Sequence, residues 1–176
     1  MIQTVIQNIE AWDNSLCLRI YSWNGRKLFD QVIYWVSRSG DGYLYGLIGI
    51  LLLFIQADAV RNVLLVGVIA FAIELPVHAI LKRLTRRSRP FIKISGIQNL
   101  IAPPKSLSFP SGHTAAAFLF ATLMSALVPT LSILFYAWAA TVGFSRVYLG
   151  VHYPTDILAG MALGLISVKI GMAVVF

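Results

Sequence analysis

The stretch Ser108-Phe109-Pro110-Ser111-Gly112-His113-Thr114 lies where a basic, proline-containing loop enters an apolar segment. Ser111 is a favourable helix N-cap, and Gly112 lets a ligand approach the backbone closely. Backbone N–H groups at a helix start attract negative charge, and His113 in the first turn can donate or accept a proton. The stretch therefore predicts an anion-binding helix N-terminus. A plain helix cap explains the same residues unless other parts of the chain supply cations and a second reactive group.

The composition indicates a membrane protein. Of the 176 residues, 58% are hydrophobic and 12% are charged, and the mean hydropathy is +0.78. Soluble globular domains carry about 25% charged residues, so this chain is far too apolar to be one. The single cysteine, Cys17, excludes an intramolecular disulfide. The N-terminus lacks the basic-then-apolar pattern of a cleaved signal peptide, so we expect the spans themselves to direct insertion.

Half of the basic residues are concentrated in one loop. Residues 82–113 contain seven of the 14 basic residues and no acidic residue: Lys82, Arg83, Arg86, Arg87, Arg89, Lys93 and Lys105. Such a loop is suited to bind an anion. Because it lies between apolar segments and has no interleaved aromatic platform, a phosphate headgroup fits better than nucleic acid. We therefore expect a lipid phosphate, and no nucleic acid, as the partner.

The N-terminal region has an amphipathic pattern. Residues 1–24 place apolar side chains at helical spacing, with polar side chains on the other faces. A helix of this kind lies on a membrane surface, and we expect the shorter amphipathic piece at 29–36 to do the same. The turn that follows is Ser39-Gly40-Asp41-Gly42. An aspartate between two glycines fits either a simple turn or a catalytic carboxylate.

We expect four or five membrane-spanning helices after residue 42. The first apolar segment is short against the requirement of about 20 residues, but it can borrow residues 40–42. In the last segment, Gly160, Gly164 and Gly171 favour close contact between helices. The expected spans are 43–57, 59–81, 114–128, 131–149 and 155–176.

Three residues of the second expected span are costly in lipid: Glu74, Pro76 and His78. We therefore expect them to face the protein interior. Glu74, His78 and Lys82 follow one another at intervals of four, which places them on one helix face. They predict a buried polar ladder that leads to the basic loop. The ladder either orients Lys82 or takes part in catalysis directly.

A third polar cluster occupies residues 145–156. Arg146 lies near a predicted helix end, where an anion can satisfy it bidentately. His152 precedes Asp156 by four residues. An aspartate that accepts from one ring nitrogen of a histidine leaves the other nitrogen as a nucleophile, although such a pair can also be purely structural. If residues 1–41 do not cross the membrane, span parity places this cluster, the basic loop and His113 at one membrane face.

Together these residues fit phosphoryl transfer. Lys82, Arg89 and Arg146 can hold the non-bridging oxygens of a phosphate, with help from Ser111 and the backbone N–H of Gly112. His152 would attack phosphorus, while His113 would protonate the leaving group and later activate water. Since Asp156 is the only carboxylate of this cluster, the sequence predicts chemistry without a metal or other cofactor.

The order of these motifs resembles the three-part signature of the type 2 phosphatidic acid phosphatase superfamily. The matching positions are Lys82 with Arg89-Pro90, then Pro110-Ser111-Gly112-His113, then Ser145-Arg146 with His152 and Asp156. The resemblance implies an integral membrane phosphatase that acts on lipid phosphates or diphosphates through a phosphohistidine. Its implied substrates include undecaprenyl diphosphate, phosphatidylglycerol phosphate, phosphatidic acid and a lipid A phosphate. The haloperoxidases that share this anion site are soluble, unlike this chain.

The resemblance also implies an architecture and a location. We expect one all-α domain over residues 1–176, a transmembrane helical bundle of five to six spans. It would comprise an interfacial region at 1–41 and a core at 43–176 with the active-site loop 82–113. Bacterial relatives imply the inner membrane and an outward-facing site, whereas the positive-inside rule applied to the basic loop favours the opposite side. A non-enzymatic lipid-phosphate binder or flippase is the alternative function.

Overall fold

The computed structural model describes residues 2–98, 100–101 and 107–176. Within these ranges the chain forms eight α-helices, one 3-10 turn and no β-strand, which confirms the all-α prediction. The helices are α1 (Ile2–Tyr21), α2 (Lys27–Ser39), α3 (Tyr43–Leu52), α4 (Asp58–Thr85), α5 (Pro90–Lys93), α6 (Gly112–Leu127), α7 (Ser132–Tyr148) and α8 (Pro154–Val175), with the 3-10 turn η1 at Pro129–Leu131.

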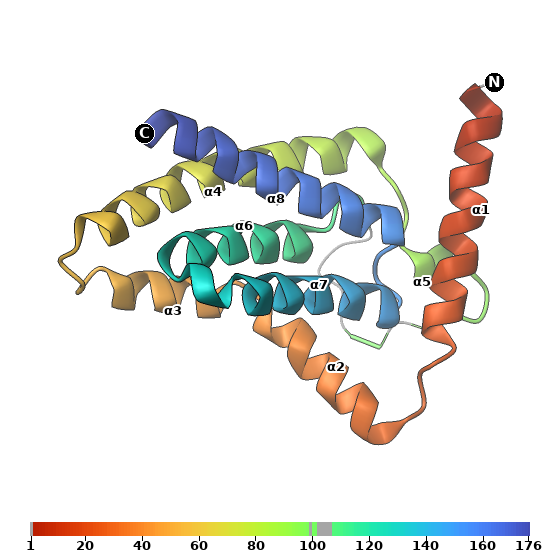
Figure 1. Cartoon of the computed structure of the whole chain (residues 1–176). Helices are drawn as coiled ribbons and strands as arrows, with labels where there is room; N and C mark the ends of the chain where they lie inside the picture. The colour runs from red at the N-terminus through yellow and green to blue at the C-terminus, as the bar shows by residue number, and fades with distance from the viewer. Residues whose placement is uncertain (1, 99, 102–106) are drawn as a thin grey trace.

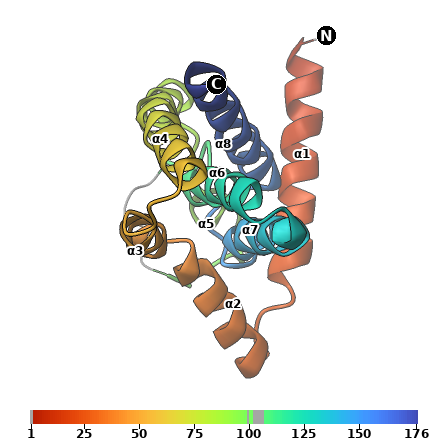
Figure 2. The same cartoon turned by 60° about the vertical axis from the view of Figure 1, so that its left-hand side comes forward.

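Helix α6 is the centre of the bundle. It packs against α4, α7 and α8, which surround it in two views (Figures 1 and 2). The contact with α8 is so close that a Cβ placed at Gly164 would lie 2.2 Å from the carbonyl oxygen of Ala115, and one at Gly160 would lie 2.4 Å from that of Ser111. A Cβ at Gly171 would likewise lie 2.9 Å from the carbonyl oxygen of Val66 on α4. The predicted close helix contacts at these three glycines are therefore confirmed.

Two helices, α4 and α8, are long and apolar enough to cross a membrane by length and composition, and α3 and α6 are shorter apolar helices. The bundle also exposes large apolar side chains to its surroundings, among them Leu47, Ile50, Leu65 and Val68. The number of spans stays a prediction. Pro76 does not end α4, which continues to Thr85. Helix α3 ends at Leu52, short of the predicted residue 57, because the chain turns there toward α4.

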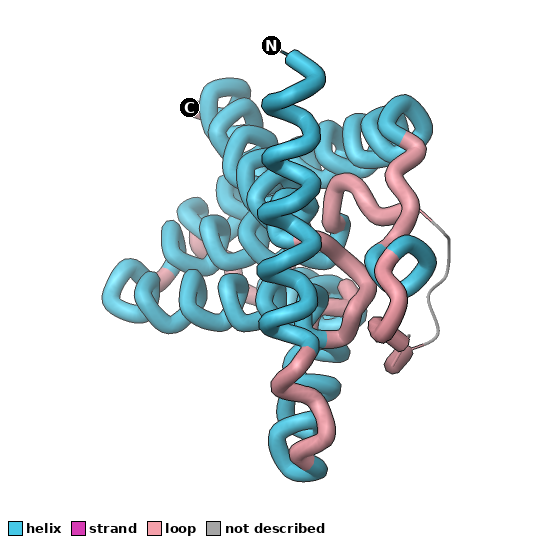
Figure 3. Tube along the Cα trace, turned by 90° about the vertical axis from the view of Figure 1, so that its right-hand side faces the viewer, coloured by secondary structure: helices cyan, strands magenta, loops and turns pink. Residues whose placement is uncertain are grey.

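Helix α1 runs across one end of the bundle instead of alongside its helices (Figures 1 and 3). It contacts α7 and α8, and α2 packs against α7. Its N-terminal half exposes Val5, Ile6 and Ile9, whereas Asp13 and Cys17 are completely buried. The structure thus has a helix where the amphipathic pattern predicted one; its place at the membrane surface stays a prediction. The short α5 in the basic loop was not predicted.

Candidate active site

Three segments that are distant in sequence meet at the end of the bundle that α1 covers. Backbone hydrogen bonds join them: Ser111 N–H donates to the carbonyl of Asp156 at 3.0 Å, Phe91 N–H to that of Gly150 at 3.3 Å, and Ser108 N–H to that of Arg87 at 2.8 Å. The basic loop, the start of α6 and the turn between α7 and α8 therefore lie together in the folded chain; that they share one membrane face stays a prediction.

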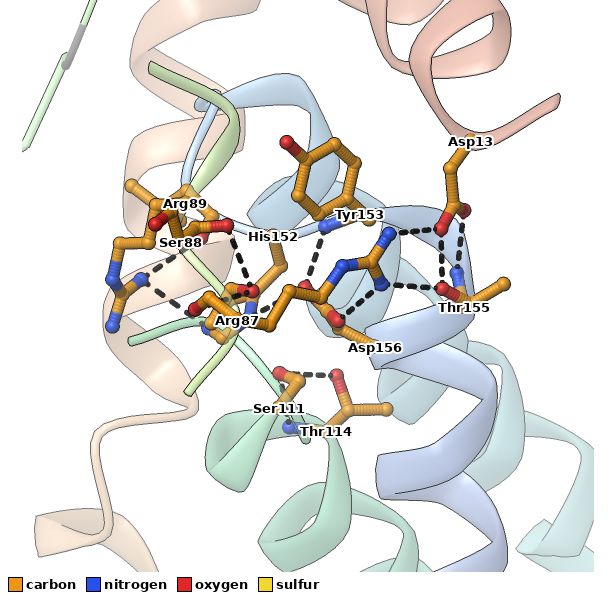
Figure 4. Close-up of polar contacts among 12 residues, drawn as sticks. Asp13, Arg87, Ser88, Arg89, Ser111, Thr114, His152, Tyr153, Thr155 and Asp156 are labelled. Atoms are coloured by element: carbon orange, nitrogen blue, oxygen red, sulfur yellow. Dashed lines mark hydrogen bonds and ion pairs between the residues drawn. The ribbon is translucent and has the colours of Figure 1, made fainter. Parts of the chain in front are cut away.

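His152 is buried at the centre of this site, in the turn before α8 (Figure 4). Its Nε2 lies 3.5 Å from Nη1 of Arg89, and its Nδ1 lies 3.5 Å from Oδ2 of Asp156. Burial, helped by the charges of Arg89 and Arg146, lowers the pKa of His152 to about 3, although Asp156 opposes the shift. The imidazole is therefore neutral at physiological pH, as a nucleophile requires.

Asp156 is held from several sides. It sits in the first turn of α8, where its Oδ2 accepts the backbone N–H of Tyr153 at 2.8 Å. Its Oδ1 accepts a hydrogen bond of 2.9 Å from Nη1 of Arg87. These contacts leave Oδ2 3.5 Å from Nδ1 of His152, which has no hydrogen-bond partner among the described residues. That Asp156 accepts a hydrogen bond from His152 and orients its ring stays a prediction.

Two buried arginines supply positive charge beside His152. Arg89 donates to the carbonyl of Val151 at 2.9 Å, and Arg146 donates to Oγ of Ser37 on α2 at 2.6 Å. The Nε of Arg146 is buried and has no hydrogen-bond partner among the described residues. A buried guanidinium that lacks a full set of partners favours binding of an anion at this position.

The start of α6 faces the same site. Ser111 is the N-cap: its Oγ accepts the N–H of Thr114 at 3.4 Å and the hydroxyl of Thr114 at 2.9 Å. This confirms the helix cap, while the anion-binding role of Ser111 and Gly112 stays a prediction. A Cβ at Gly112 would lie 3.0 Å from Nε2 of His78, so glycine permits the close approach of α4 to α6.

His113 has a carboxylate partner that the sequence left open. Its Nε2 lies 2.9 Å from Oδ1 of Asp41, in the turn between α2 and α3. The other oxygen of Asp41 pairs with Nη1 of Arg38 at 3.0 Å. Asp41 therefore belongs to the site and is not only a turn residue.

A cavity of about 720 Å³ extends from His113 between α3, α4 and α6. Its walls are mainly apolar, and its polar lining includes Asp41, Glu74 and His78. Glu74 is buried and His78 is half-buried at the cavity, so the prediction that they face the interior is confirmed. The same prediction is wrong for Pro76, which is exposed on the outer surface of α4. Lys82 lies in the last turn of α4, half-buried, and Lys105 lies outside the described residues. Two roles stay open for Glu74 and His78: they orient Lys82, or they take part in catalysis directly.

Three residues of the site were not predicted: Asp13, Ser37 and Arg87. Arg87 was counted only as one charge of the basic loop, and the spacing of that loop does not indicate which arginine points inward. Asp13 is one of the polar residues of the amphipathic pattern at 1–24, which predicted it on the exposed side of a surface helix, yet it is completely buried. Its burial results from the packing of α1 against the bundle, for which the local sequence carries no signal.

Comparisons with known proteins agree with the motif order. The family model described as the PAP2 superfamily matches residues 61–176. The bacitracin transport permease protein BcrC of Bacillus licheniformis is 30% identical over 77% of this chain, which spans 58% of that relative's length. The undecaprenyl-diphosphatase of Sulfolobus acidocaldarius is 29% identical over 83% of this chain and 70% of its own length.

Two crystal structures are similar over nearly the whole chain. LpxE of Aquifex aeolicus superposes with a TM-score of 0.80 at 27% identity, covering 92% of this chain and 95% of LpxE. The transmembrane PAP2-type phosphatidylglycerolphosphate phosphatase of Bacillus subtilis gives a TM-score of 0.75 at 27% identity, covering 95% of this chain and 86% of its own. Because the family model covers nearly all of α4 and the whole of α5 to α8, with the motif residues that meet at the site, the chain belongs to the PAP2 superfamily.

Proposed function

We propose that the protein is an integral membrane hydrolase that removes phosphate from a lipid phosphate or diphosphate. The observation that carries this proposal is the buried, neutral His152 between Arg89 and Asp156, in a site that adjoins an apolar cavity at His113. The relatives support it, since their names include an undecaprenyl-diphosphatase, a lipid A 1-phosphatase and a phosphatidylglycerolphosphate phosphatase.

The proposed reaction has two steps. In the first, Nε2 of His152 attacks phosphorus in line while Asp156 accepts the Nδ1–H hydrogen bond. The bond to the leaving oxygen breaks, and that oxygen takes a proton from His113. In the second step, water returns a proton to His113 and attacks the phosphohistidine. The P–N bond breaks, Nε2 of His152 is restored, and inorganic phosphate leaves.

The cations and the helix start would stabilise the transition state. Phosphoryl transfer spreads negative charge over the equatorial oxygens, so fixed positive groups are the main catalytic resource. In our proposal Lys82, Arg89 and Arg146 bind those oxygens, with Ser111 and the N–H of Gly112 at the N-terminus of α6. The buried Nε of Arg146 supports this assignment, because it has a hydrogen bond left to donate.

The cavity supports a lipid as the leaving group. Its apolar walls between α3 and α6 suit a hydrocarbon chain whose phosphate lies at His113. Undecaprenyl diphosphate, phosphatidylglycerol phosphate, phosphatidic acid and a lipid A phosphate all fit this description.

We place the protein in the bacterial inner membrane with the site at the outer face. The C-terminus lies at the opposite end of the bundle from the site, so a tagged C-terminus found outside intact cells would contradict that orientation (Figure 1).

A second candidate is a transporter or lipid-phosphate binder with the same anion site. The relative from Bacillus licheniformis is named a transport permease protein, and this name supports the second candidate. The two functions differ in their need for the histidines. A binder needs the cations alone, whereas turnover also needs His152 and His113.

The test is phosphate release from a panel of lipid phosphates and diphosphates in detergent micelles. We expect His152→Ala to abolish release and His113→Ala to slow it by about two to four powers of ten, the usual contribution of general acid–base catalysis. Phosphoenzyme that is trapped in the wild type by an alkaline quench, and that is stable to base but lost in acid, would support the phosphohistidine. Release by His152→Ala at the wild-type rate would contradict the mechanism, and binding without release in the wild type would favour the transporter.

A further inference from the structure

Asp13 is a completely buried carboxylate on a helix that is otherwise largely exposed. Its Oδ1 accepts the backbone N–H of Thr155 at 3.0 Å. Its Oδ2 accepts hydrogen bonds from the hydroxyl of Thr155 and from Nη2 of Arg87. Burying a carboxylate is costly unless it is paired and hydrogen-bonded. These contacts therefore allow Asp13 to be buried where α1 packs against the bundle.

Arg87 connects Asp13 to the reacting residues (Figure 4). Its Nη1 donates to Oδ1 of Asp156 at 2.9 Å and to Oγ1 of Thr155 at 2.7 Å. Its guanidinium also lies 4.0 Å above the ring of Tyr153, the residue next to His152. Although burial opposes it, the charges of Asp156 and Asp13 raise the pKa of Arg87 above its ordinary value.

The orientation of Asp156 depends on this arginine. Only one of its two oxygens, Oδ2, lies toward Nδ1 of His152, at 3.5 Å. Arg87 holds the other oxygen, and Asp13 together with Thr155 holds Arg87. Without Asp13, the Nη2 group of Arg87 would lose its carboxylate partner, and the guanidinium could rotate away from Asp156. The rotation would free the carboxylate that lies beside Nδ1 of His152.

We propose that Asp13 and Arg87 are positioning residues of the reaction: helix α1, through Arg87, sets the orientation in which Asp156 holds the ring of His152. This inference rests on the proposed role of His152 as nucleophile. It makes α1 part of the active site, although Asp13 lies outside the residues that the family model matches.

The kinetic test compares Asp13→Asn with a matched variant on the same helix, Glu10→Gln. Glu10 pairs with Lys93 at 4.0 Å, and both side chains are more than half exposed, so this contact also links α1 to the basic loop but does not reach Asp156. We expect Asp13→Asn to lower kcat about tenfold to a hundredfold with KM within about twofold, and Glu10→Gln to match the wild type. The double variant Asp13→Asn/Arg87→Gln should be no slower than Arg87→Gln alone, because both changes break one chain of contacts.

A second readout does not depend on turnover. The chain contains three histidines, so ¹⁵N-histidine labelling in detergent gives three imidazole spin systems that single His→Gln variants can assign. We expect His152 of the wild type to be the Nδ1–H tautomer and Asp13→Asn to show a mixture of tautomers. The signals of His78 and His113 serve as the control for folding and should not move.

Arg87→Lys decides the question if Asp13→Asn does not fold. A lysine keeps the charge but lacks the planar fork that joins two carboxylates, so it should give the same tautomer mixture and loss of kcat. An unchanged His152 tautomer with wild-type kcat, or an equal loss in Glu10→Gln, would overturn the inference. If the proposed function itself were wrong, the wild type would release no phosphate, while the tautomer change in Asp13→Asn would still appear.

Discussion

Nε2 of His113 lies 2.9 Å from the carboxylate of Asp41, although the two residues are 72 positions apart in the chain. Each histidine of the site thus faces one carboxylate, because Asp156 lies beside His152. Asp41 belongs to the N-terminal part of the chain, outside the residues matched by the family model, as does Asp13. The segment before α3 therefore contributes two buried or half-buried carboxylates to a site whose recognisable motifs all lie after it.

The contact between Asp41 and His113 predicts a loss of acid–base catalysis in Asp41→Asn. The amide preserves size but not charge, so it stabilises the protonated imidazole less and holds the ring less firmly. We expect kcat for phosphate release to fall about tenfold to a hundredfold, part of the 10²–10⁴ that general acid–base help supplies. Asp58→Asn is the matched control, since Asp58 is exposed at the far end of α4 and should leave kcat unchanged. Equal rates for both variants would exclude Asp41 from catalysis.

The buried His152 predicts a loss of stability in acid. Its pKa falls from an ordinary 6.5 to about 3 on folding. Between these values the unfolded chain binds a proton that the folded chain does not, so stability is complete above pH 6.5 and is lost as pH falls toward 3. As pH falls through that window, the unfolding free energy of the wild type should drop faster than that of His152→Gln. The difference should be about 1.4 kcal/mol for each pH unit. Unfolding in detergent at a series of pH values measures the difference; parallel curves would contradict it.

The contact between α6 and α8 predicts that Gly164→Ala destabilises the bundle. The new Cβ would lie 2.2 Å from the carbonyl oxygen of Ala115, and backbone atoms can relieve this clash only if the helices move apart. We expect a cost of about 1–3 kcal/mol, seen as a lower midpoint of thermal unfolding in detergent. Gly46→Ala on α3 is the control, because a Cβ there meets no atom within 4 Å. If Gly164→Ala unfolded at the same temperature as the control, the prediction would be wrong, and α6 and α8 would be packed less tightly than the structure shows.

The ligand set of the site predicts activity that does not need a divalent metal. Among residues 2–98, 100–101 and 107–176, no group of three His, Cys, Asp or Glu side chains lies close enough together to hold a metal ion. The charge on phosphate would be neutralised by arginine and lysine instead. Phosphate release should therefore persist in excess chelator. A loss of activity that magnesium restores would reveal a metal site.

Much of the fold follows from local patterns. Long apolar runs and amphipathic spacing predicted the main helices, because each helix buries or exposes its own side chains with a fixed period. Glycine spacing in α8 predicted its close packing, since only residues without a side chain allow two backbones to approach. The ends of the helices were less predictable: α3 stops at Leu52, and the short α5 depends on contacts of the basic loop with the turn before α8.

The order of motifs alone placed Arg89, Ser111, His113, Arg146, His152 and Asp156 in one candidate site, because together they match the signature of the family. Only the tertiary structure decided which carboxylate accompanies His113 and which arginine holds Asp156. Asp41 and Asp13 reach the site through the packing of α1 and the α2–α3 turn. A buried polar contact between distant segments depends on the desolvation of both partners, which exists only once the chain is folded.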